Sequence, residues 1–367
     1  MKSIILVMAA ILAIQGSCLP QSPNGEPYEA VLFSSDSGNN GTCYRIPALI
    51  RTPNGNLIAA ADQRNNGCGD LRWNDDINIV GRVSTDNGQN WSEVRTLVDY
   101  PKGQSASDPS LLVDEATGTI FLFFNYMDLQ LEKGIYYHRY IQSTDNGQSW
   151  SQPADITPMI TLPEWKNDFR FITSGRGIQT SDGKLIHTLV NLERGVFLFG
   201  STDHGETWSR MSEAIRQADE SKIVELSDGI WMVNSRVNGA GCRYIHLSGD
   251  QGKSWDTKAD SSLADPGCNA DLLLFHPEKN AGGNLLLFAN ARHASNRQNL
   301  TVSLSADDGK SWPVNKSIYE GASAYVTLCR LENDNIGLFF EKDDYRDLVF
   351  VRFSLSWLTA AALPSKQ

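Results

Sequence analysis

Ser84-Thr85-Asp86-Asn87-Gly88-Gln89-Asn90-Trp91 carries the pattern S-x-D-x-G-x-x-W, and the same pattern returns four more times along the chain. The later copies start at Ser143, Ser201, Ser248 and Ser305, so neighbouring starts lie 47 to 59 residues apart. The aspartate can accept hydrogen bonds from backbone amides ahead of it, and the glycine adopts a positive φ at little steric cost. The tryptophan then re-enters a strand and can pack between neighbouring sheets. We interpret these copies, called Asp boxes below, as folding turns without a catalytic part.

Strand-like runs precede every Asp box, and they cover residues 77–83, 136–141, 195–199, 244–247 and 300–304. Further β-like runs cover 119–124 and 337–340, and only 212–219 has a helical pattern. A fixed period of this size indicates a repeat array, and four strands in each unit of about 50–60 residues are typical of a propeller blade. The sequence therefore predicts an all-β fold, a six-bladed β-propeller with four-stranded antiparallel blades, of which one lacks a clear box.

The composition is that of a globular protein and excludes several other classes. The chain has 367 residues, of which 41% are hydrophobic and 20% are charged, so a coiled coil or a disordered chain is excluded. No linker interrupts the repeats, which favours a single domain. The net charge of −11 argues against a nucleic-acid partner. An anionic substrate would need a pocket whose positive charge is a local exception.

The first eighteen residues have the pattern of a secretory signal peptide. Lys2 precedes an apolar run over residues 4–14 that is too short to span a bilayer, and Gly16 and Cys18 are small residues suited to cleavage after Cys18. A bacterial lipoprotein, cut before Cys18 and lipidated on it, is the alternative. We expect a signal peptide at 1–18, a linker at 19–30, the propeller at 31–360 and a tail at 361–367. The mature protein would be soluble and secreted or extracytoplasmic, which means periplasmic or lipid-anchored in a bacterium.

Six cysteines are present, and removal of Cys18 with the signal peptide would leave an odd number. Two disulfides are possible, Cys43–Cys68 and Cys242–Cys268. The chain contains no C-x-x-C, no H-E-x-x-H and no cluster of cysteine and histidine. A zinc site is therefore not expected.

Tyr44-Arg45-Ile46-Pro47 stands ahead of the first Asp box. This R-I-P motif followed by repeated Asp boxes resembles the exo-α-sialidase (neuraminidase) family, and the resemblance extends from Arg45 to Leu358. It implies a glycoside hydrolase that removes terminal α-linked sialic acid from glycoproteins, glycolipids and oligosaccharides, with 31–360 as its catalytic domain. Sialylated glycans would be its partners, and a single propeller gives no reason against a monomer.

The family holds the carboxylate of sialic acid with three arginines from separate blades. Arginine suits this task because its guanidinium group is planar, always charged and able to form two parallel hydrogen bonds to a carboxylate. Arg45 matches the first of the three, Arg236 the second and Arg297 the third. Arg292 is a competing candidate for the third position.

A tyrosine nucleophile distinguishes this family from most retaining glycosidases. A carboxylate nucleophile would be repelled by the carboxylate of the substrate, whereas a neutral phenol would not. The phenol has an ordinary pKa near 10 and therefore needs a base beside it. Tyr325 matches the nucleophile, and Glu220, which precedes Arg236 by sixteen residues, matches the base. The resemblance thus implies a retaining mechanism through a covalent tyrosyl-sialoside.

The acid/base residue of the family is an aspartate that follows an arginine on a loop at the end of a strand. Asp70, six residues after Arg64, matches it, and Asp75 and Asp76 are competing carboxylates nearby. The resemblance makes Asp70 the general acid and later the general base. Arg64 resembles a residue that helps to hold the sugar ring.

Two further carboxylates complete the expected site. Asp108, in S-D-P-S, resembles another pocket carboxylate that contacts the substrate. Glu341 resembles the partner that orients Arg45 by an ion pair from behind. The mechanism requires no metal and no cofactor.

Three alternatives remain open on the sequence alone. A trans-sialidase would pass the sugar to an acceptor glycan held between aromatic residues, for which Tyr126, Trp165 and Phe169 are candidates. A hydrolase of a related nonulosonic acid would share the same residues. An Asp-box propeller that only binds sugar or acts as a scaffold would be expected to have an incomplete catalytic set.

Overall fold

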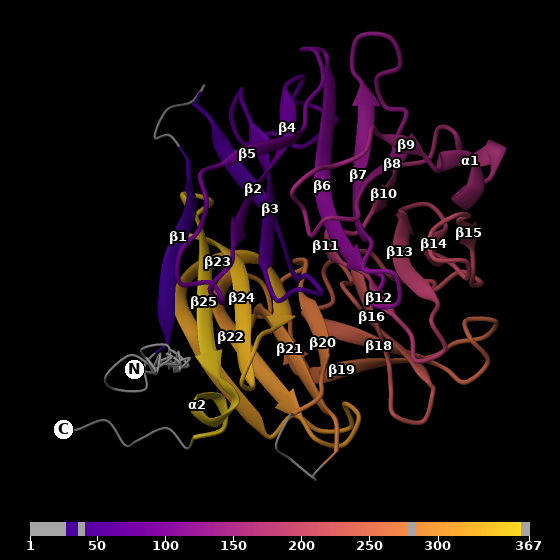
Figure 1. Ribbon diagram of the computed structural model, residues 1–367. Helices are drawn as coiled ribbons and strands as arrows, with labels where there is room; N and C mark the ends of the chain where they lie inside the picture. Colours follow the sequence, from indigo (N-terminus) through magenta and orange to yellow (C-terminus); the bar gives the residue numbers. More distant parts are fainter. Residues whose placement is uncertain (1–26, 36–40, 278–282, 361–367) are drawn as a thin grey trace, which may run out of the picture.

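The computed structural model describes residues 27–35, 41–277 and 283–360, and nearly all of its regular structure is β-strand (Figure 1). The all-β class expected from the sequence is confirmed. The described helices are α1 (Thr157–Ile160), the 3₁₀ helix η1 (Pro163–Trp165) and α2 (Leu355–Thr359). None of the described helices has both the length and the apolar character needed to cross a bilayer. The expected signal peptide, residues 19–26 of the expected linker and the expected tail lie outside the described residues.

Two sheets contain four strands in chain order, each antiparallel to the next. The first sheet contains β2 (Cys43–Arg51), β3 (Leu57–Arg64), β4 (Ile77–Ser84) and β5 (Arg95–Val98). The second contains β16 (Ser221–Glu225), β17 (Trp231–Ser235), β18 (Cys242–Ser248) and β19 (Asp256–Ala264).

Two other sheets have five strands each, because one extra strand of two residues pairs with a sheet of four. One contains β6 (Gln104–Val113), β7 (Ile120–Asp128), β8 (Tyr137–Ser143) and β9 (Ala154–Asp155), with β11 (Gly175–Arg176) parallel to β6. The other contains β10 (Arg170–Ile172), β13 (Leu185–Asn191), β14 (Gly195–Ser201) and β15 (Ser209–Arg210), with β12 (Ile178–Gln179) also paired to β13.

The last sheet has seven strands in the order β1-β25-β24-β23-β22-β21-β20. These strands are β1 (Tyr28–Ser34), β20 (Asp271–Phe275), β21 (Leu285–Ala291), β22 (Gln298–Ser305), β23 (Val314–Arg330), β24 (Asn335–Lys342) and β25 (Asp347–Ser354). The two halves of β23 have different partners, since residues 314–322 pair with β22 and residues 323–330 pair with β24. Figure 1 shows β1 beside β25, so the first and last of the described strands are neighbours at one edge of this sheet. Because β1 begins at Tyr28, the strand starts three residues before the expected domain boundary.

The five Asp boxes form the same turn. In the first box, the Ser84 hydroxyl accepts a hydrogen bond from the Gly88 amide at 2.9 Å, and the Asp86 carboxylate accepts one from the Asn90 amide at 2.8 Å. Gly88 has the expected positive φ of 82°, and Asn87 before it has a φ of 59° that the sequence analysis did not anticipate. The other four boxes repeat both hydrogen bonds. The interpretation of the boxes as structural turns agrees with this repetition.

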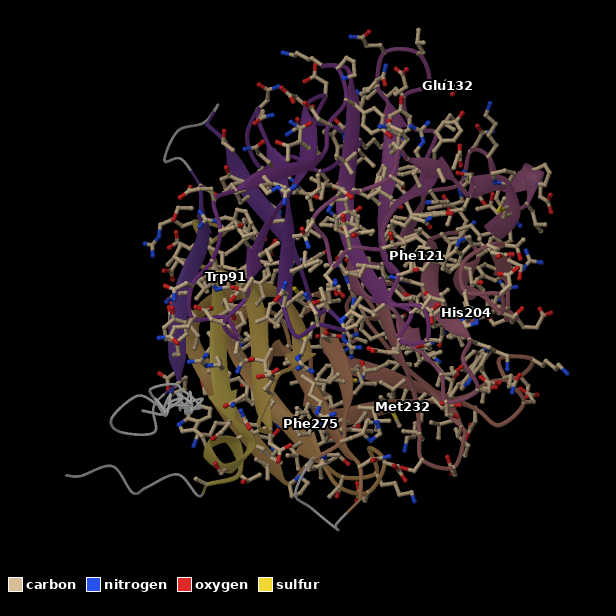
Figure 2. All side chains as sticks on the ribbon, viewed as in Figure 1. Trp91, Phe121, Glu132, His204, Met232 and Phe275 are labelled. Carbon is tan, nitrogen blue, oxygen red and sulfur yellow. A yellow bond between two sulfur atoms is a disulfide. The ribbon has the colours of Figure 1, made fainter. Side chains whose placement is uncertain are left out.

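The hydrophobic core fills the spaces between neighbouring sheets, and the box tryptophans contribute to it as expected. Figure 2 shows side chains such as Trp91 and Phe121 packed in these spaces. The rings of Trp91 and Phe350 meet at 5.2 Å between centroids, and those of Phe121 and Trp208 at 5.3 Å, both edge to face. The box glycine Gly205 lies against the Phe121 ring of the preceding sheet, so closely that an added Cβ atom would clash. The boxes therefore join each sheet to its neighbour.

The predicted helix over residues 212–219 is wrong. Ile215 is buried and forms a β-bridge with Val196, each amide donating to the carbonyl of the other residue. The backbone groups that a helix would use internally are thus bonded to a strand of the sheet. The apolar spacing in this segment reflects contacts with that sheet.

One of the two expected disulfides is confirmed and the other is wrong. Cys43 and Cys68 are bonded and tie the start of β2 to the loop after β3. Cys242 and Cys268 are both free. The Asp265 carboxylate accepts hydrogen bonds from the Gly267 and Cys268 amides at 2.9 and 3.2 Å, which turns this loop inward. Cys268 is therefore fully buried, whereas Cys242 lies partly exposed at the start of β18.

Candidate active site

A cavity of about 400 Å³ gathers the residues that the sequence analysis selected. Seven of the nine line it, and they are Arg45, Asp70, Asp108, Glu220, Arg236, Arg297 and Tyr325. The other two, Arg64 and Glu341, are buried behind the wall and contact Asp70 and Arg45 respectively. The polarity of β22 places this cavity relative to the Asp boxes, because Arg297 precedes its first residue and the last box begins at its final residue. The boxes therefore lie at the opposite ends of the strands.

Glu341 connects Arg45 to the backbone of two strands. Its carboxylate accepts from Arg45 Nε at 2.6 Å and Nη2 at 3.4 Å, from the Ile46 amide at 2.9 Å and from the Tyr325 amide at 3.1 Å. The pairing register of β2 shifts between Arg45 and Ala48, and Ile46 has a φ of 62°. A β-branched residue in this left-handed region is strained, so the bonds to Glu341 help to hold the bulge that directs Arg45 into the cavity.

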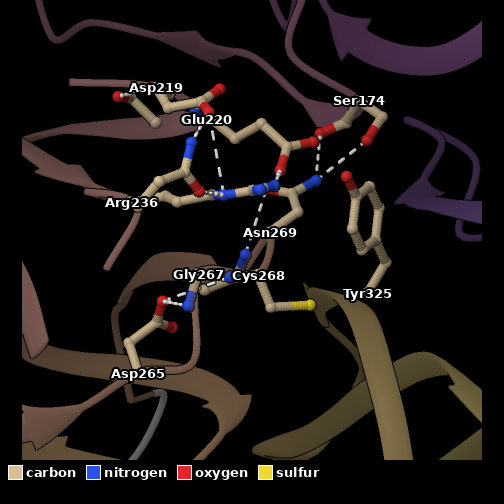
Figure 3. A network of polar contacts seen from close by, with 12 residues as sticks. Ser174, Asp219, Glu220, Arg236, Asp265, Gly267, Cys268, Asn269 and Tyr325 are labelled. Carbon is tan, nitrogen blue, oxygen red and sulfur yellow. Dashed lines mark hydrogen bonds and ion pairs between the residues drawn. The ribbon is translucent and has the colours of Figure 1, made fainter. Parts of the chain in front are cut away.

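Glu220 and Arg236 face each other across one hairpin. Asp219 and Glu220 precede β16 and Arg236 follows β17, so their backbones continue the antiparallel ladder. Arg236 donates from Nη1 to Glu220 at 2.6 Å and from Nε to Asn238 at 2.7 Å. Figure 3 shows this pair and, across from it, Tyr325. Glu220 and Arg236 are sixteen positions apart in the sequence but lie side by side in the site.

Tyr325 is surrounded by charged groups. Its ring centroid lies 5.8 Å from the Arg45 guanidinium carbon and 5.5 Å from that of Arg297. Burial, followed by the negative charge of Glu220, raises the pKa of Tyr325 well above its ordinary value, although Arg236 and Arg297 oppose this shift. The phenol is therefore protonated in the free site and needs a proton acceptor before it can act as a nucleophile.

Arg297 occupies the position expected of the third arginine. It donates to the Tyr345 hydroxyl at 3.2 Å and to the Gly267 carbonyl at 3.3 Å. Arg292, the competing candidate, donates to the Ser262 carbonyl and is absent from the described lining of the cavity. Tyr345 was missed by the sequence analysis, although its ring lies 3.7 Å from the Arg45 guanidinium carbon. It lies in the turn between β24 and β25, where no repeat or motif marks it.

The loop under Tyr325 and Arg297 is held by side chains that the sequence analysis did not select. Asp265 fixes the backbone at Gly267 and Cys268, and Asn269 donates to the Ser174 hydroxyl at 2.8 Å (Figure 3). The loop thereby presents the Gly267 carbonyl to Arg297. Short loops rich in small and polar residues carry little sequence signal for such a role.

Asp70 lines the cavity from the loop after β3, and its carboxylate is exposed. Arg64, which is 1% exposed, donates from Nη1 to Asp70 at 2.7 Å, while the Asp70 side chain is 67% exposed. Burial tends to raise the pKa of Asp70, but the charges of Arg64, Arg45 and Arg297 lower it to a net value below the ordinary one. The competing carboxylates Asp75 and Asp76 are absent from the described lining.

Asp108 differs from Asp70 in its protonation. Burial and the neighbouring charge of Asp62 raise the pKa of Asp108 to about 8, so it carries a proton at neutral pH. Its amide donates to Asp62 at 2.9 Å and its carboxyl group accepts from Asn125 at 3.0 Å. Asp108 also has a left-handed φ of 62°, at a register shift in β6 that resembles the one in β2.

An apolar wall faces the arginines. It consists of Leu71, Trp73, Tyr136, Phe169, Phe171 and Leu192. Of the aromatic residues considered for an acceptor site, Phe169 is on this wall, but Tyr126 and Trp165 are buried in the cores between sheets. Tyr126 and Trp165 are therefore wrong as acceptor residues. Trp73, which is 68% exposed, was missed.

The described residues contain no group of three or more histidine, cysteine or acidic side chains that could hold a metal ion. Three arginines at the cavity are each paired with a carboxylate, Arg45 with Glu341, Arg64 with Asp70 and Arg236 with Glu220. Such a cavity can bind a planar anion, and its lining also includes the Tyr325 phenol and the carboxyl groups of Asp70, Asp108, Asp219 and Glu220.

Comparison with known proteins identifies the family of the chain. The family model described as "BNR repeat-like domain" matches residues 55–338. The sialidase of Micromonospora viridifaciens is 36% identical over 96% of this chain and 57% of its own length, and that of Bacteroides fragilis is 28% identical over 83% and 60%. The chain thus spans about 57–60% of the length of these two relatives.

Solved structures give the same result. "Hadza microbial sialidase Hz136" superposes with a TM-score of 0.77 at 30% identity, covering 86% of this chain and 66% of that one. A leech intramolecular trans-sialidase, complexed with 2,7-anhydro-Neu5Ac, also reaches a TM-score of 0.77 over 90% of this chain, but its 20% identity supports only the fold. Identity and coverage together place the chain in the BNR-repeat sialidase family.

Proposed function

We propose that the protein is an exo-α-sialidase that hydrolyses terminal α-linked sialic acid from glycoproteins, glycolipids and oligosaccharides with retention of configuration. The observation that carries the proposal is the convergence of Arg45, Arg236 and Arg297 on one cavity that also contains Tyr325 and Glu220. The chain as a whole is acidic, so this concentration of arginines is the local exception that an anionic substrate requires.

The three arginines would bind the carboxylate on the anomeric carbon. Arg45 and Arg236 each already have a glutamate partner, which fixes their guanidinium groups before substrate arrives. Arg297 contacts a tyrosine hydroxyl and a carbonyl instead, so its charge is the least compensated of the three among the described contacts. Preorganised donors of this kind lower the cost of ordering the site on binding.

The first chemical step would form the covalent intermediate. Glu220 takes the phenolic proton as the Tyr325 oxygen attacks the anomeric carbon, and Asp70 gives its proton to the departing glycosidic oxygen. In the second step Asp70 takes a proton from water, the water oxygen attacks the anomeric carbon, and Tyr325 leaves with the proton held by Glu220. Two displacements at one carbon retain its configuration.

Asp70 must be protonated to begin this cycle, although its pKa is low in the free site. A bound carboxylate would neutralise part of the charge on Arg45 and Arg297, which are two of the groups that lower the pKa of Asp70. Binding would also displace water from the cavity and so further favour the neutral form. Substrate binding itself would thus prepare the acid.

The six-bladed architecture is part of the proposal. If each half of β23 belongs to its own blade, the seven-stranded sheet divides into β20-β21-β22-β23 and β23-β24-β25-β1, which gives six four-stranded blades in all. Five of the blades carry an Asp box after their third strand, and the sixth has α2 at that position. The first strand of the chain would complete the last blade.

Export from the cytoplasm is proposed on two grounds. Residues 1–18 have the pattern of a signal peptide, and the Cys43–Cys68 disulfide is of a kind that persists in oxidising compartments. Residues 28–360 would then form the catalytic domain of the mature protein.

Hydrolysis of a fluorogenic α-sialoside by the mature protein tests the function. We expect wild-type turnover, collapse of turnover in Tyr325→Phe and Asp70→Ala, and an NMR spectrum of early product with the retained anomer. Release of the inverted anomer would contradict the mechanism. Sialyllactose as the main product in the presence of lactose would identify a transferase, and binding of sialic acid without turnover would identify a sugar-binding protein.

A further inference from the structure

A second repeat runs through the fold. Its members are buried polar residues, each near the carboxyl end of the second strand in one of the six proposed four-stranded groups. They are Asp62 on β3, Asn125 on β7, Asn191 on β13, Asn234 on β17, Asn290 on β21 and Glu341 on β24, all at most 1% exposed. Unlike the Asp boxes, this repeat includes the strand group that ends in α2. Four members are asparagines and two are carboxylates, and both carboxylates are directly behind the candidate site.

Three members of the repeat bond to a strand of a neighbouring sheet. Glu341 accepts from the Ile46 amide of β2, Asn125 bonds to both backbone groups of Ile172 in β10, and Asp62 accepts from the Asp108 amide of β6. The neutral asparagine suffices to hold Ile172. Attachment of the neighbouring strand therefore does not explain why two members of the repeat carry a negative charge.

For Glu341 that reason is Arg45, and for Asp62 it is Arg64. Asp62 is fully buried, and one of its oxygens accepts from Arg64 Nε at 3.1 Å, Arg64 Nη2 at 2.9 Å and the Ser107 hydroxyl at 2.6 Å. The other oxygen accepts from the Asp108 amide. Burial raises the pKa of Asp62, whereas the charge of Arg64 and the hydrogen bonds from Ser107, Arg64 and the Asp108 amide act in the opposite direction. Since Asp62 and not Asp108 bonds to Arg64, we assign the ionised form of this neighbouring pair to Asp62. A buried arginine in turn requires such a counter-ion.

Arg64 therefore lies between two carboxylates. Its Nε and Nη2 edge is occupied by Asp62, which leaves Nη1 to donate to Asp70 and to the Cys68 carbonyl at 2.7 and 2.8 Å. Rotation of the guanidinium group would break the bonds to Asp62. Asp62 thus fixes the direction from which Arg64 meets Asp70, although Asp62 itself is outside the described lining of the cavity.

We propose that Asp62 is the positioning residue for the proton-transfer side of the site, where it orients Arg64 toward Asp70, offsets the charge of Arg64 and anchors the backbone of Asp108. This inference rests on the proposed function of Asp70 as acid and base. Asp62 would orient Arg64 and hold the neighbouring strand, just as Glu341 orients Arg45 and holds its neighbouring strand.

The charged groups around Asp62 give the sign of the expected pH effect. Arg64 and Asp70 follow it in the chain, Arg45 is its register partner on β2, and Asp108 approaches from β6. Loss of the negative charge would leave Arg64 uncompensated and would lower the pKa of both Asp70 and Asp108. The protonated forms would then be lost at lower pH, so the basic limb of the kcat profile, which reports groups of the substrate complex, would move to lower pH.

The test is Asp62→Asn, which introduces the residue that four other members of the repeat already have. We expect the basic limb to move down by about one pH unit and kcat for 3′-sialyllactose to fall by about 10- to 100-fold. The leaving group of an aryl sialoside needs little protonation, so kcat for this substrate should fall less. The logarithm of its fold-change should be less than about one third of that for 3′-sialyllactose. Equal losses for the two substrates with an unmoved limb would overturn the proposal.

Glu341→Gln is the matched control, because it removes the other buried carboxylate of the repeat. It should raise KM for both substrates and move the basic limb less than Asp62→Asn does, since it acts on Arg45, whereas Arg64 bonds directly to Asp70. If Asp62→Asn does not fold, Ser107→Ala removes one hydrogen bond to the same oxygen of Asp62 and should lower kcat by about 2- to 5-fold. If kcat of Ser107→Ala does not fall more for sialyllactose than for the aryl sialoside, the inference would again be overturned. Wild-type protein inactive on both substrates would instead contradict the proposed function.

Discussion

The two sides of the cavity differ in the ratio of arginine to carboxylate. On one side three arginines meet, of which Arg45 and Arg236 each pair with a glutamate, Asp219 lies 3.7 Å from Arg236, and Arg297 has no carboxylate partner among the described contacts. On the other side Arg64 alone bonds to both Asp62 and Asp70, with Asp108 close by and Arg72 also in the lining. Three guanidinium groups suit the binding of an anion, whereas three carboxyl groups that share one bonded arginine favour retention of a proton. The comparison indicates that one side of the cavity binds and the other side transfers protons.

Tyr325→Phe tests the nucleophile that lies between the two sides, and it should have the largest effect. Loss of the phenolic oxygen prevents the covalent step, so kcat on any sialoside should fall by about 10³-fold or more while the fold is retained. Turnover and circular dichroism measure these two expectations. Tyr345→Phe is the control, since it keeps the ring against Arg45 and removes only a hydrogen bond to Arg297. Turnover of Tyr325→Phe within tenfold of wild type would remove Tyr325 from the mechanism.

Arg297→Lys tests the binding side. Lysine keeps the charge but loses the planar fork, which costs roughly 1.5–3 kcal/mol for a hydrogen bond to a charged group. KM and the Kd for free sialic acid should therefore rise by about 10- to 100-fold, with a smaller change in kcat and an unmoved pH profile. Arg292→Lys is the matched control outside the cavity. A fall in kcat at constant KM would show that the two sides are not divided in this way.

Asp108→Asn tests proton retention on the other side through stability. Because the folded pKa of about 8 exceeds the ordinary value of 3.8, the stabilising contribution is fully present below pH 3.8 and is lost as pH rises through 8. Between pH 5 and 8, the free energy of unfolding should fall by about 3–4 kcal/mol more in wild type than in the asparagine variant. Urea unfolding at both pH values measures it. Parallel pH dependences would mean that Asp108 holds no proton in the folded protein.

Gly205→Ala tests whether the Asp boxes are separate from both sides. Its φ of 88° and its contact with Phe121 should make the variant less stable by about 1–3 kcal/mol, with kcat/KM changed by less than about twofold. Gly183→Ala is a close control, because Gly183 has a φ of 89° but open space around it. The difference between the two melting temperatures isolates the packing against Phe121. A large loss of activity in Gly205→Ala would connect the boxes to the site.

Most of the fold and the candidate site could be predicted from the sequence, because both carry local signals. The Asp boxes depend on side chains bonding to their own backbone within four residues, so their pattern is visible in the chain. The site residues are predicted from a family resemblance that motifs such as R-I-P carry, and several of them, including Arg64, Arg297 and Glu341, lie at or beside strand ends. The strand runs before the boxes also correspond to strands β4, β8, β14, β18 and β22.

The errors share a different cause, which is contact between distant parts of the chain. Asp62 is an ordinary acidic residue in sequence, and only its burial against Arg64 and β6 distinguishes it. Ile215 has helical spacing but bonds to a strand. Trp165 has the character of a sugar-binding aromatic residue, yet it packs against Phe197 in a core. Local patterns do not contain the burial that decides each of these cases.

The pairing of β1 with β25 has a consequence for the time course of synthesis. The Ser34 and Asp347 side chains are hydrogen bonded at 2.7 Å across 313 positions of sequence. At about 5–20 residues per second, a ribosome would deliver the partner of β1 roughly 15–60 s after β1 itself. Throughout that interval β1 would be an unpaired strand, able to associate with another copy of the chain. The growing chain is thus most exposed to mispairing before the sheet that contains Glu341 can form.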